Sequence, residues 1–258
     1  MKRLKTNRMI KEIEKGGIFR DKLEAGRKSP LKTYMELSIG GTSLYQLFKY
    51  EFITCLLGPM PGGFGLLMRK IFYSRLVKKA GKGLIIGRNV VIRHPDKITF
   101  GDNVTIDDNC LVDARGAGAD GILFEDGVII NRNCMIQAKS GSIRLGRRTS
   151  IGSNSVLVSM DGIEIEESVL MAGGCCISAG LYHVDDMEKP IMDQGIYTKD
   201  PVRIGRGSWL GTGITVLDGV TIGCGAILGA GSLANKDIPD YAVAFGVPAK
   251  VKKTRQAK

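Results

Sequence analysis

Metal-binding and nucleotide-binding motifs are missing from this sequence. Its six cysteines form no CxxC pair, and its only histidines, His94 and His183, lie far apart, so we expect no metal site. No GxxxxGK[ST] motif occurs, and the glycines of GCGAILG at 223–229 do not follow the GxGxxG pattern. These residues therefore give no support to a P-loop or a Rossmann site.

Long apolar runs are also missing. No stretch reaches the roughly 20 apolar residues that span a bilayer, and residues 1–40 contain no apolar core of a secretory signal. The cysteines are scattered apart from one adjacent pair, which favours free thiols in a reducing compartment. The sequence therefore predicts a cytoplasmic protein, and contact with the inner face of the membrane stays open.

Acidic residues are scarce in the N-terminal part. Residues 1–80 contain 17 Lys and Arg against 6 Asp and Glu, whereas residues 81–258 contain 20 of each kind, so the N-terminal part accounts for the net charge of +11. Such a segment favours an anionic surface, either a membrane or nucleic acid. Because no nucleic-acid module or arginine-aromatic interleaving accompanies it, we expect no nucleic acid partner.

Glycine is abundant, and it recurs with a period of six. Aliphatic residues return at every sixth position of 203–235, and a glycine directly follows four of these five residues: Ile204, Leu210, Val216, Ile222 and Leu228. A hexad then forms one face of a coil, and three faces form a triangular turn of 18 residues. Because one coil cannot bury its own apolar side, stacked coils are expected. The pattern predicts a mainly β fold, a parallel β-helix solenoid.

The repeat divides the chain into three parts. We expect a basic helical segment over 1–80, the β-helix over 81–235, and an extended segment with a basic tail over 236–258. The repeat is interrupted most strongly at 178–202, by an excursion loop long enough to leave the solenoid. Loops of this length are usually functional or disordered.

Two amphipathic helices are expected before the repeat. Apolar residues fall on one helical face over 44–56, and a second stripe with basic flanks runs over 64–79. The pair would either cap the end of the solenoid or lie in a membrane interface through 44–80.

The hexads, together with PVRIGRGSWLGTGITVLDGVTIGCGAILGAGSLANKDIPDYAVAFGVPAKV, resemble the hexapeptide-repeat O-acetyltransferases. That family includes the maltose, galactoside, capsule and exopolysaccharide acetyltransferases. The resemblance covers about 81–253 and is most specific over 201–253. It implies a left-handed coil, a homotrimer with active sites between subunits, acetyl-CoA as donor and a saccharide hydroxyl as acceptor.

The resemblance places the catalytic base at His183, in the sequence GLYHVDD of the excursion loop. Imidazole suits this task because its unperturbed pKa, about 6.5, lies near neutrality. Asp185 and Asp186 would orient the ring or bind a sugar hydroxyl, although solvated loop carboxylates explain them equally well. His94 lies in no site motif and is expected to be structural.

The remaining site residues are also assigned by resemblance. Trp209 would lie beside the CoA arm or at a trimer interface, and a backbone N–H near Thr212 would face the thioester carbonyl. The lysines would meet CoA phosphates or form a solvated tail. The expected donor-binding residues are Trp209, Gly211, Thr212, Gly213, Ala230, Gly231, Asn235, Lys236, Lys250 and Lys253, and the expected acceptor-binding residues are Ser153, Asn154, Ser155 and Tyr182.

These features favour an acyl-CoA-dependent O-acyltransferase that acts on a saccharide or a lipid-linked saccharide precursor in polysaccharide biosynthesis. N-acylation of an amino sugar would use the same base and groove and remains an alternative. A non-catalytic trimeric scaffold of the same fold is the alternative from another class, because fold does not fix function.

Overall fold

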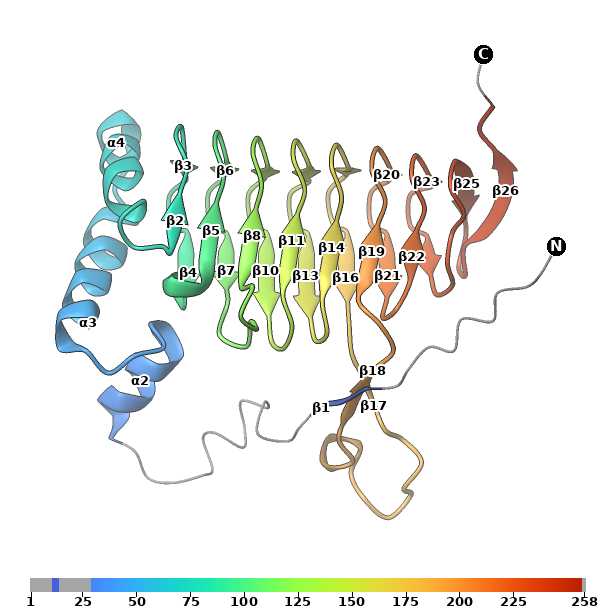
Figure 1. The fold of residues 1–258 in the computed structure, drawn as a ribbon, viewed down its shortest axis with the longest axis horizontal. Coiled ribbons are helices and arrows are strands. Elements are labelled where there is room, and N and C mark those ends of the chain that lie inside the picture. Colours follow the sequence, from blue (N-terminus) through green and yellow to red (C-terminus); the bar gives the residue numbers. More distant parts are fainter. Residues whose placement is uncertain (1–10, 14–28, 257–258) are drawn as a thin grey trace.

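The structure, a computed structural model, describes residues 11–13 and 29–256 and shows a parallel β-helix with helices at its N-terminal end (Figure 1). Each coil passes through three sheets in turn, so strands one coil apart pair in parallel. The predicted mainly β solenoid is thus confirmed.

Each sheet contains short strands from successive coils. Sheet 1 consists of β2 (Lys79–Ala80), β5 (Ile98–Phe100), β8 (Ile122–Phe124), β11 (Ile143–Leu145), β14 (Ile163–Ile165), β19 (Val202–Ile204) and β22 (Thr221–Ile222). Sheet 2 consists of β3 (Ile85–Ile86), β6 (Thr105–Ile106), β9 (Ile129–Ile130), β12 (Ser150–Ile151), β15 (Leu170–Met171), β20 (Trp209–Leu210), β23 (Ile227–Leu228), β25 (Ala242–Phe245) and β26 (Lys250–Thr254). Sheet 3 consists of β4 (Val91–Arg93), β7 (Leu111–Asp113), β10 (Met135–Ala138), β13 (Val156–Ser159), β16 (Cys176–Ser178), β21 (Thr215–Leu217) and β24 (Leu233–Ala234).

The interior of the coil is filled by the aliphatic residues of the hexads. Ile204, Val216 and Ile222 have no exposed surface, and Leu228 is 1% exposed. These side chains stack on their counterparts one coil away and form a single continuous core. The core extends beyond residue 235, where the sequence suggested that the repeat ends. Ile238 bridges to Ile222, and Ala244 is buried where β25 adds a further strand to sheet 2.

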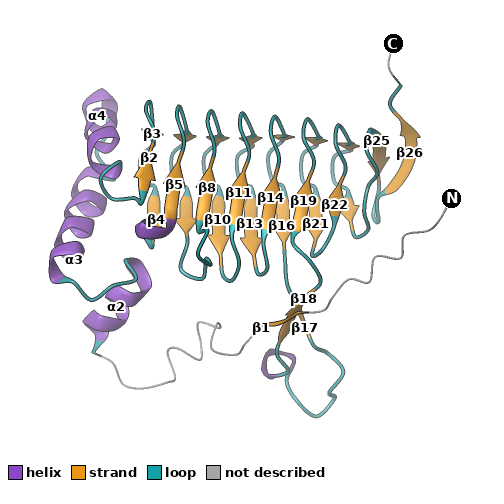
Figure 2. Cartoon of the chain, viewed as in Figure 1, coloured by secondary structure: helices purple, strands orange, loops and turns teal. Residues whose placement is uncertain are grey.

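The helices lie at the N-terminal end of the solenoid (Figure 2). They are α2 (Pro30–Ser38), α3 (Leu44–Glu51), the π-helical η2 (Phe52–Leu57) and α4 (Gly62–Tyr73). The second helix ends six residues earlier than the expected Lys79, because Lys79 pairs with β5 in sheet 1. Of the basic helical segment expected over 1–80, residues 1–10 and 14–28 lie outside the described residues. Among the described residues, no helix combines the length and apolar character needed to cross a bilayer.

Three polar side chains fasten the helices to the first coil. The Tyr50 hydroxyl donates to the Ile92 carbonyl at 2.9 Å, and the Tyr73 hydroxyl donates to Val90 at 3.1 Å. The buried Arg69 donates from Nε to the Ile86 carbonyl at 2.9 Å. Burial raises the pKa of Tyr73 to about 12. The helices therefore cover the open end of the hydrophobic core, as a cap does.

The excursion loop leaves the solenoid between β16 and β19, and Figure 1 shows it projecting from the coils. It contains β17 (Leu181–Tyr182), the 3₁₀ turn η4 (Ile191–Asp193) and β18 (Ile196–Thr198); the other 3₁₀ turn, η3 (Pro95–Lys97), lies in the first coil. β18 pairs antiparallel with β17 and with β1 (Lys11–Ile13). The N-terminal strand was not anticipated, since it has no hexad or amphipathic signal.

Candidate active site

The corner between sheets 2 and 3 changes its chemistry along the solenoid. One residue per coil has a positive φ there. In coil order these residues are Asn89, Asn109, Asn133, Asn154, Gly174, Gly213 and Gly231. Asparagine tolerates the left-handed conformation, so the turn alone does not require glycine. The last three coils therefore lack a side chain that the backbone would have permitted.

The glycine corners are bare. A Cβ at Gly213 or Gly231, whose φ values are +69° and +68°, would point into open space. Their neighbours Thr212 and Ala230 are exposed and small, and the Gly231 N–H donates to the Thr212 carbonyl at 2.8 Å, which stacks the two coils. A thin ligand is thus able to lie against the main chain here, along the predicted donor-binding residues. Gly211, at the same corner, is buried, and a Cβ there would meet Ala230 N at 2.8 Å.

Trp209 lies on the outer face of sheet 2, one strand before this corner. Its side chain is 49% exposed. It is in register with Ile227, then Val243, then Lys253 across four adjacent strands. With strands about 4.8 Å apart, Lys253 lies about 14 Å from Trp209 along the sheet. An aromatic surface and a cation are thus placed at the two ends of one column.

The C-terminal lysines lie on β26 at the end of sheet 2. Lys250 and Lys253 are exposed, and the Lys252 ammonium lies 5.2 Å from the centre of the Phe245 ring. These side chains are available to an anionic ligand as point charges, without the bidentate geometry of arginine.

Asn235 and Lys236 lie elsewhere than predicted. They follow β24, at the corner between sheets 3 and 1, whereas Ala230 and Gly231 precede that strand. The width of sheet 3 separates the two pairs within one chain. Within one chain the two pairs therefore do not line one groove, because the hexad period carries the chain around a corner between them, and the donor-binding role of Asn235 and Lys236 stays a prediction.

The base of the excursion loop is held by Asp218, a residue that no sequence motif singles out. Its Oδ1 accepts from the Gly180 N–H at 3.0 Å and its Oδ2 accepts from the Lys199 N–H at 2.8 Å. The side chain is buried, and burial raises its pKa above the ordinary range. One carboxylate from the next coil thus joins both ends of the loop.

His183 is positioned by the small antiparallel sheet of the loop. Its main-chain N–H donates to the Gly195 carbonyl at 3.2 Å, and its imidazole ring packs against the Tyr197 ring with centroids 4.7 Å apart. The residue is partly buried. Tyr182, expected to bind the acceptor, precedes it on β17 and is 49% exposed.

The two expected carboxylates differ in environment. Asp186 accepts from the Glu188 N–H at 3.0 Å and pairs with the Lys189 ammonium at 3.0 Å, which together hold the pKa of its carboxyl below the usual range. Its own N–H donates to Gln194 Oε1 at 3.0 Å. Asp186 therefore stabilises the loop turn, and its expected role beside His183 or at a sugar hydroxyl stays a prediction. Asp185 is exposed.

The expected acceptor residues at 153–155 belong largely to the repeat. Ser155 is fully buried, and its hydroxyl donates to the Gly152 carbonyl at 2.7 Å and accepts from the Cys175 N–H at 3.2 Å. Asn154 accepts a hydrogen bond from the Asn133 side chain at 3.2 Å, within the row of asparagines at the corner between sheets 2 and 3. Ser153 is partly exposed. We therefore leave Ser155 out of the site, because its hydroxyl is fully used inside the coil.

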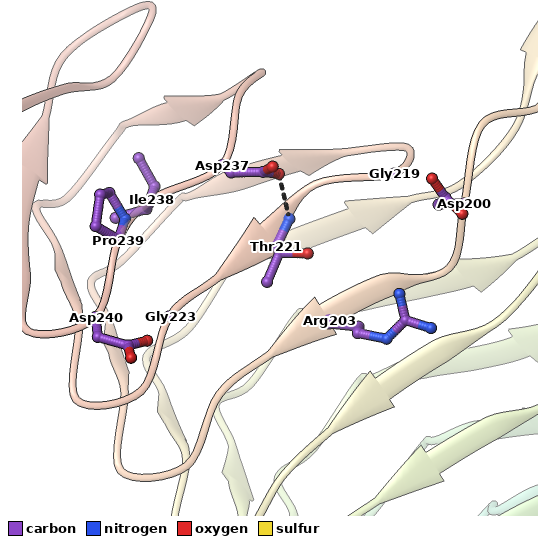
Figure 3. Close-up of a pocket in the computed structure, with 9 residues that line it drawn as sticks. All are labelled: Asp200, Arg203, Gly219, Thr221, Gly223, Asp237, Ile238, Pro239 and Asp240. Carbon is purple, nitrogen blue, oxygen red and sulfur yellow. Dashed lines mark hydrogen bonds between the residues drawn. The ribbon is translucent and has the colours of Figure 1, made fainter. Parts of the chain in front are cut away.

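A surface hollow of about 470 Å³ lies on sheet 1, lined by Asp200, Arg203, Gly219, Thr221, Gly223, Asp237, Ile238, Pro239 and Asp240 (Figure 3). Two of its three carboxylates accept main-chain N–H groups: Asp237 from Thr221 at 2.9 Å and Asp240 from Cys224 at 2.8 Å. None of the predicted site residues lines it. Over the described residues, no three metal-ligating side chains gather in a cluster.

His183 and the bare corner lie on opposite sides of sheet 3. His183 belongs to the loop that leaves β16 toward sheet 1, while Gly213 and Gly231 precede β21 and β24 from sheet 2. A strand of three residues separates the corners by about 10 Å. Within one chain the structure therefore does not bring His183 to the predicted donor groove.

Comparisons with known proteins find acetyltransferases among the proteins to which this chain is similar. No family model matches the chain. It is 46% identical over 116 residues to a probable acetyltransferase of Mycobacterium tuberculosis, which covers 45% of this chain and 38% of that protein. It is 37% identical over 113 residues to a galactoside O-acetyltransferase of Lactococcus lactis, covering 43% of this chain and 53% of that protein. The resemblance to the hexapeptide-repeat acetyltransferases is confirmed.

The chain spans about half or less of the length of these curated relatives. Among solved structures, a maltose O-acetyltransferase from Clostridium difficile is 22% identical, with a TM-score of 0.46, over 83% of this chain and 90% of that one. A galactoside acetyltransferase in complex with coenzyme A is 20% identical, with a TM-score of 0.43, over 81% and 80% of the two chains.

Proposed function

We propose that this protein is an acyl-CoA-dependent O-acyltransferase that transfers acetyl from acetyl-CoA to a hydroxyl of a saccharide. The principal support is the exchange of asparagine for glycine at one corner in the last three coils, beside the half-exposed Trp209. The relatives named as acetyltransferases, one of them a galactoside O-acetyltransferase, support the same reaction.

The donor would lie along the bare corner and the outer face of sheet 2. Trp209 offers a flat apolar surface for the pantetheine arm or the adenine, and Lys250 and Lys253 offer positive charge to the phosphates. The thioester would lie near Thr212, whose main-chain N–H would stabilise the charge that develops on the carbonyl oxygen in the tetrahedral intermediate.

His183 would act as general base. It would take the proton of the acceptor hydroxyl while the oxygen attacks the thioester carbonyl, and the thiolate of CoA would leave with that proton. The residue is partly buried, and the contact with Tyr197 holds its ring. Such proton transfer typically contributes about 10²–10⁴-fold to the rate.

The complete site would form between copies of the chain in a homotrimer. This follows from the separation of His183 and the glycine corner by the width of sheet 3, since a neighbouring chain would supply the missing half. The outer face of sheet 2 exposes Ile85, Ile129 and Leu170 at 41%, 42% and 51%, which suits contact between copies. The outer face of sheet 1 instead has ion pairs such as Arg144–Glu125.

Calorimetric titration with acetyl-CoA, followed by detection of free thiol with sugar and amino-sugar acceptors, tests the proposal. We expect the wild type and His183→Ala to bind the donor equally, and thiol release to fall by about 10²–10⁴-fold in the variant. Thiol release with an amino sugar alone would favour N-acylation. A folded trimer that binds no acetyl-CoA would contradict the enzyme and favour a scaffold.

A further inference from the structure

The helices at the N-terminal end have a second apolar face, which points away from the coil. On α3 and η2, Leu44, Phe48, Phe52 and Leu56 recur every four residues and are 68%, 73%, 42% and 54% exposed. The opposite side of the same helices buries Tyr50, Ile53 and Leu57 against the solenoid. Capping therefore uses only one side of this segment.

Exposed apolar side chains also lie on α4. Phe52 meets Phe72 edge to face with ring centroids 6.2 Å apart, which joins η2 to α4. Phe64 and Leu67 on α4 are 65% and 50% exposed. We call this set of side chains, Leu44, Phe48, Phe52, Leu56, Phe64 and Leu67, the exposed stripe. An apolar surface of this extent on a folded domain usually marks an interaction site.

The charges around the exposed stripe indicate its partner. Residues 29–80 contain seven basic side chains, and Lys32, Lys70, Arg75, Lys78 and Lys79 among them are exposed. The two acidic residues are Glu36 and Glu51, and the Glu51 carboxylate accepts hydrogen bonds from the Tyr34 hydroxyl and the Cys55 thiol. The Arg75 guanidinium lies 5.6 Å from the centre of the Phe72 ring, at the edge of the apolar surface.

We propose that this helical layer docks the protein on an anionic lipid bilayer. Apolar and aromatic side chains would enter the interface while the surrounding lysines and arginines meet the lipid phosphates. The helices are too short to span the bilayer and would lie in its plane. The layer lies at the opposite end of the solenoid from the coils with bare corners, so docking leaves those coils accessible. The proposal does not depend on the acyltransferase reaction.

Sedimentation of the full-length protein with lipid vesicles tests this docking. We expect the wild type to bind vesicles of equal parts phosphatidylcholine and phosphatidylglycerol, and to bind phosphatidylcholine alone at least about fivefold more weakly. The double variant Phe48→Ser, Leu56→Ser should bind the anionic vesicles more than about tenfold more weakly, because two large apolar side chains are lost from the interface. Both residues are exposed, so the melting temperature should stay unchanged.

Matched controls separate this docking from other uses of the surface. The double variant Met187→Ser, Ile191→Ser removes two side chains that are 92% and 55% exposed on the excursion loop, and it should bind vesicles as the wild type does. Lys70→Glu should weaken binding about fivefold and Lys139→Glu should not. Equal vesicle binding by wild type and the Phe48, Leu56 variant would overturn the proposal. A smaller oligomer in that variant, with vesicle binding unchanged, would also overturn it and assign the face to contacts between copies.

Discussion

At the scale of single residues, the two histidines have different tasks. His94 has a φ of +52° at the first corner, and its Nε2 lies 2.8 Å from the Glu36 carbonyl, so it ties α2 to the solenoid. His183 is held in the excursion loop by Gly195 and Tyr197. The expectation that His94 is structural agrees with these contacts.

The environment of His94 predicts how the stability of the fold changes with pH. Burial, opposed by the hydrogen bond to Glu36 and reinforced by Lys97, lowers the pKa of His94 below its ordinary 6.5. The unfolded state therefore takes up a proton first as the pH falls. The stability that neutral His94 contributes is present above about pH 6.5 and is lost as the pH falls through the folded-state pKa.

Melting temperatures at pH 8 and pH 5 check this. The wild type should lose more stability on acidification than His94→Asn, a variant chosen because asparagine tolerates a positive φ. An equal loss in both proteins would show that His94 does not contribute to the acid sensitivity.

At the scale of elements, the excursion loop depends on the two hydrogen bonds that the Asp218 carboxylate accepts from its ends. Asparagine at this position retains one acceptor oxygen in place of two, so one of the bonds to Gly180 and Lys199 is lost. A hydrogen bond to a charged group contributes roughly 1.5–3 kcal/mol. In Asp218→Asn we expect amide exchange at 180–199 to accelerate by about tenfold or more.

Hydrogen exchange by mass spectrometry measures this change, with Asp237→Asn as the control. Asp237 accepts a main-chain N–H on sheet 1 in a similar way, and it lies outside the excursion loop 178–202. Amide exchange at 180–199 as slow in both variants as in the wild type would show that Asp218 does not hold the loop.

The elements also show which parts of the structure the sequence predicts. Hexads determine the solenoid because Ile204 and its equivalents must all face inward, and the interruption at 178–202 shows where the chain leaves it. Asp218 could not be selected, since its partners lie 38 and 19 residues away along the chain. The hexad period places Asn235 one corner beyond Gly231, whereas its assignment to the donor-binding residues came from the family resemblance alone.

At the scale of the whole molecule, the proposed function requires more than one chain. His183 and Gly213 lie on opposite sides of sheet 3, so each proposed site would take its base from one chain and its donor groove from another. Two impaired variants, His183→Ala and Gly213→Asn, should then complement each other when they are produced together. If the two variants assemble at random, about a quarter of the sites contain both an intact His183 and an intact Gly213 corner.

Thiol release by the co-produced variants measures this complementation, and each variant produced alone supplies the baseline. Activity no higher than the sum of the two baselines would mean that both residues act within one chain or that no shared site exists.

Acetyl-CoA titration into Gly213→Asn tests whether the donor lies along the bare corner, on which the proposed function depends. Asparagine occupies the equivalent position in Asn109 and Asn133, so the turn accommodates it, and only the new side chain alters the corner. The reverse change, Asn109→Gly, is the control. We predict that Gly213→Asn binds acetyl-CoA at least about tenfold more weakly while Asn109→Gly binds it as the wild type does. Unchanged affinity for acetyl-CoA in a folded Gly213→Asn variant would contradict donor binding at this corner.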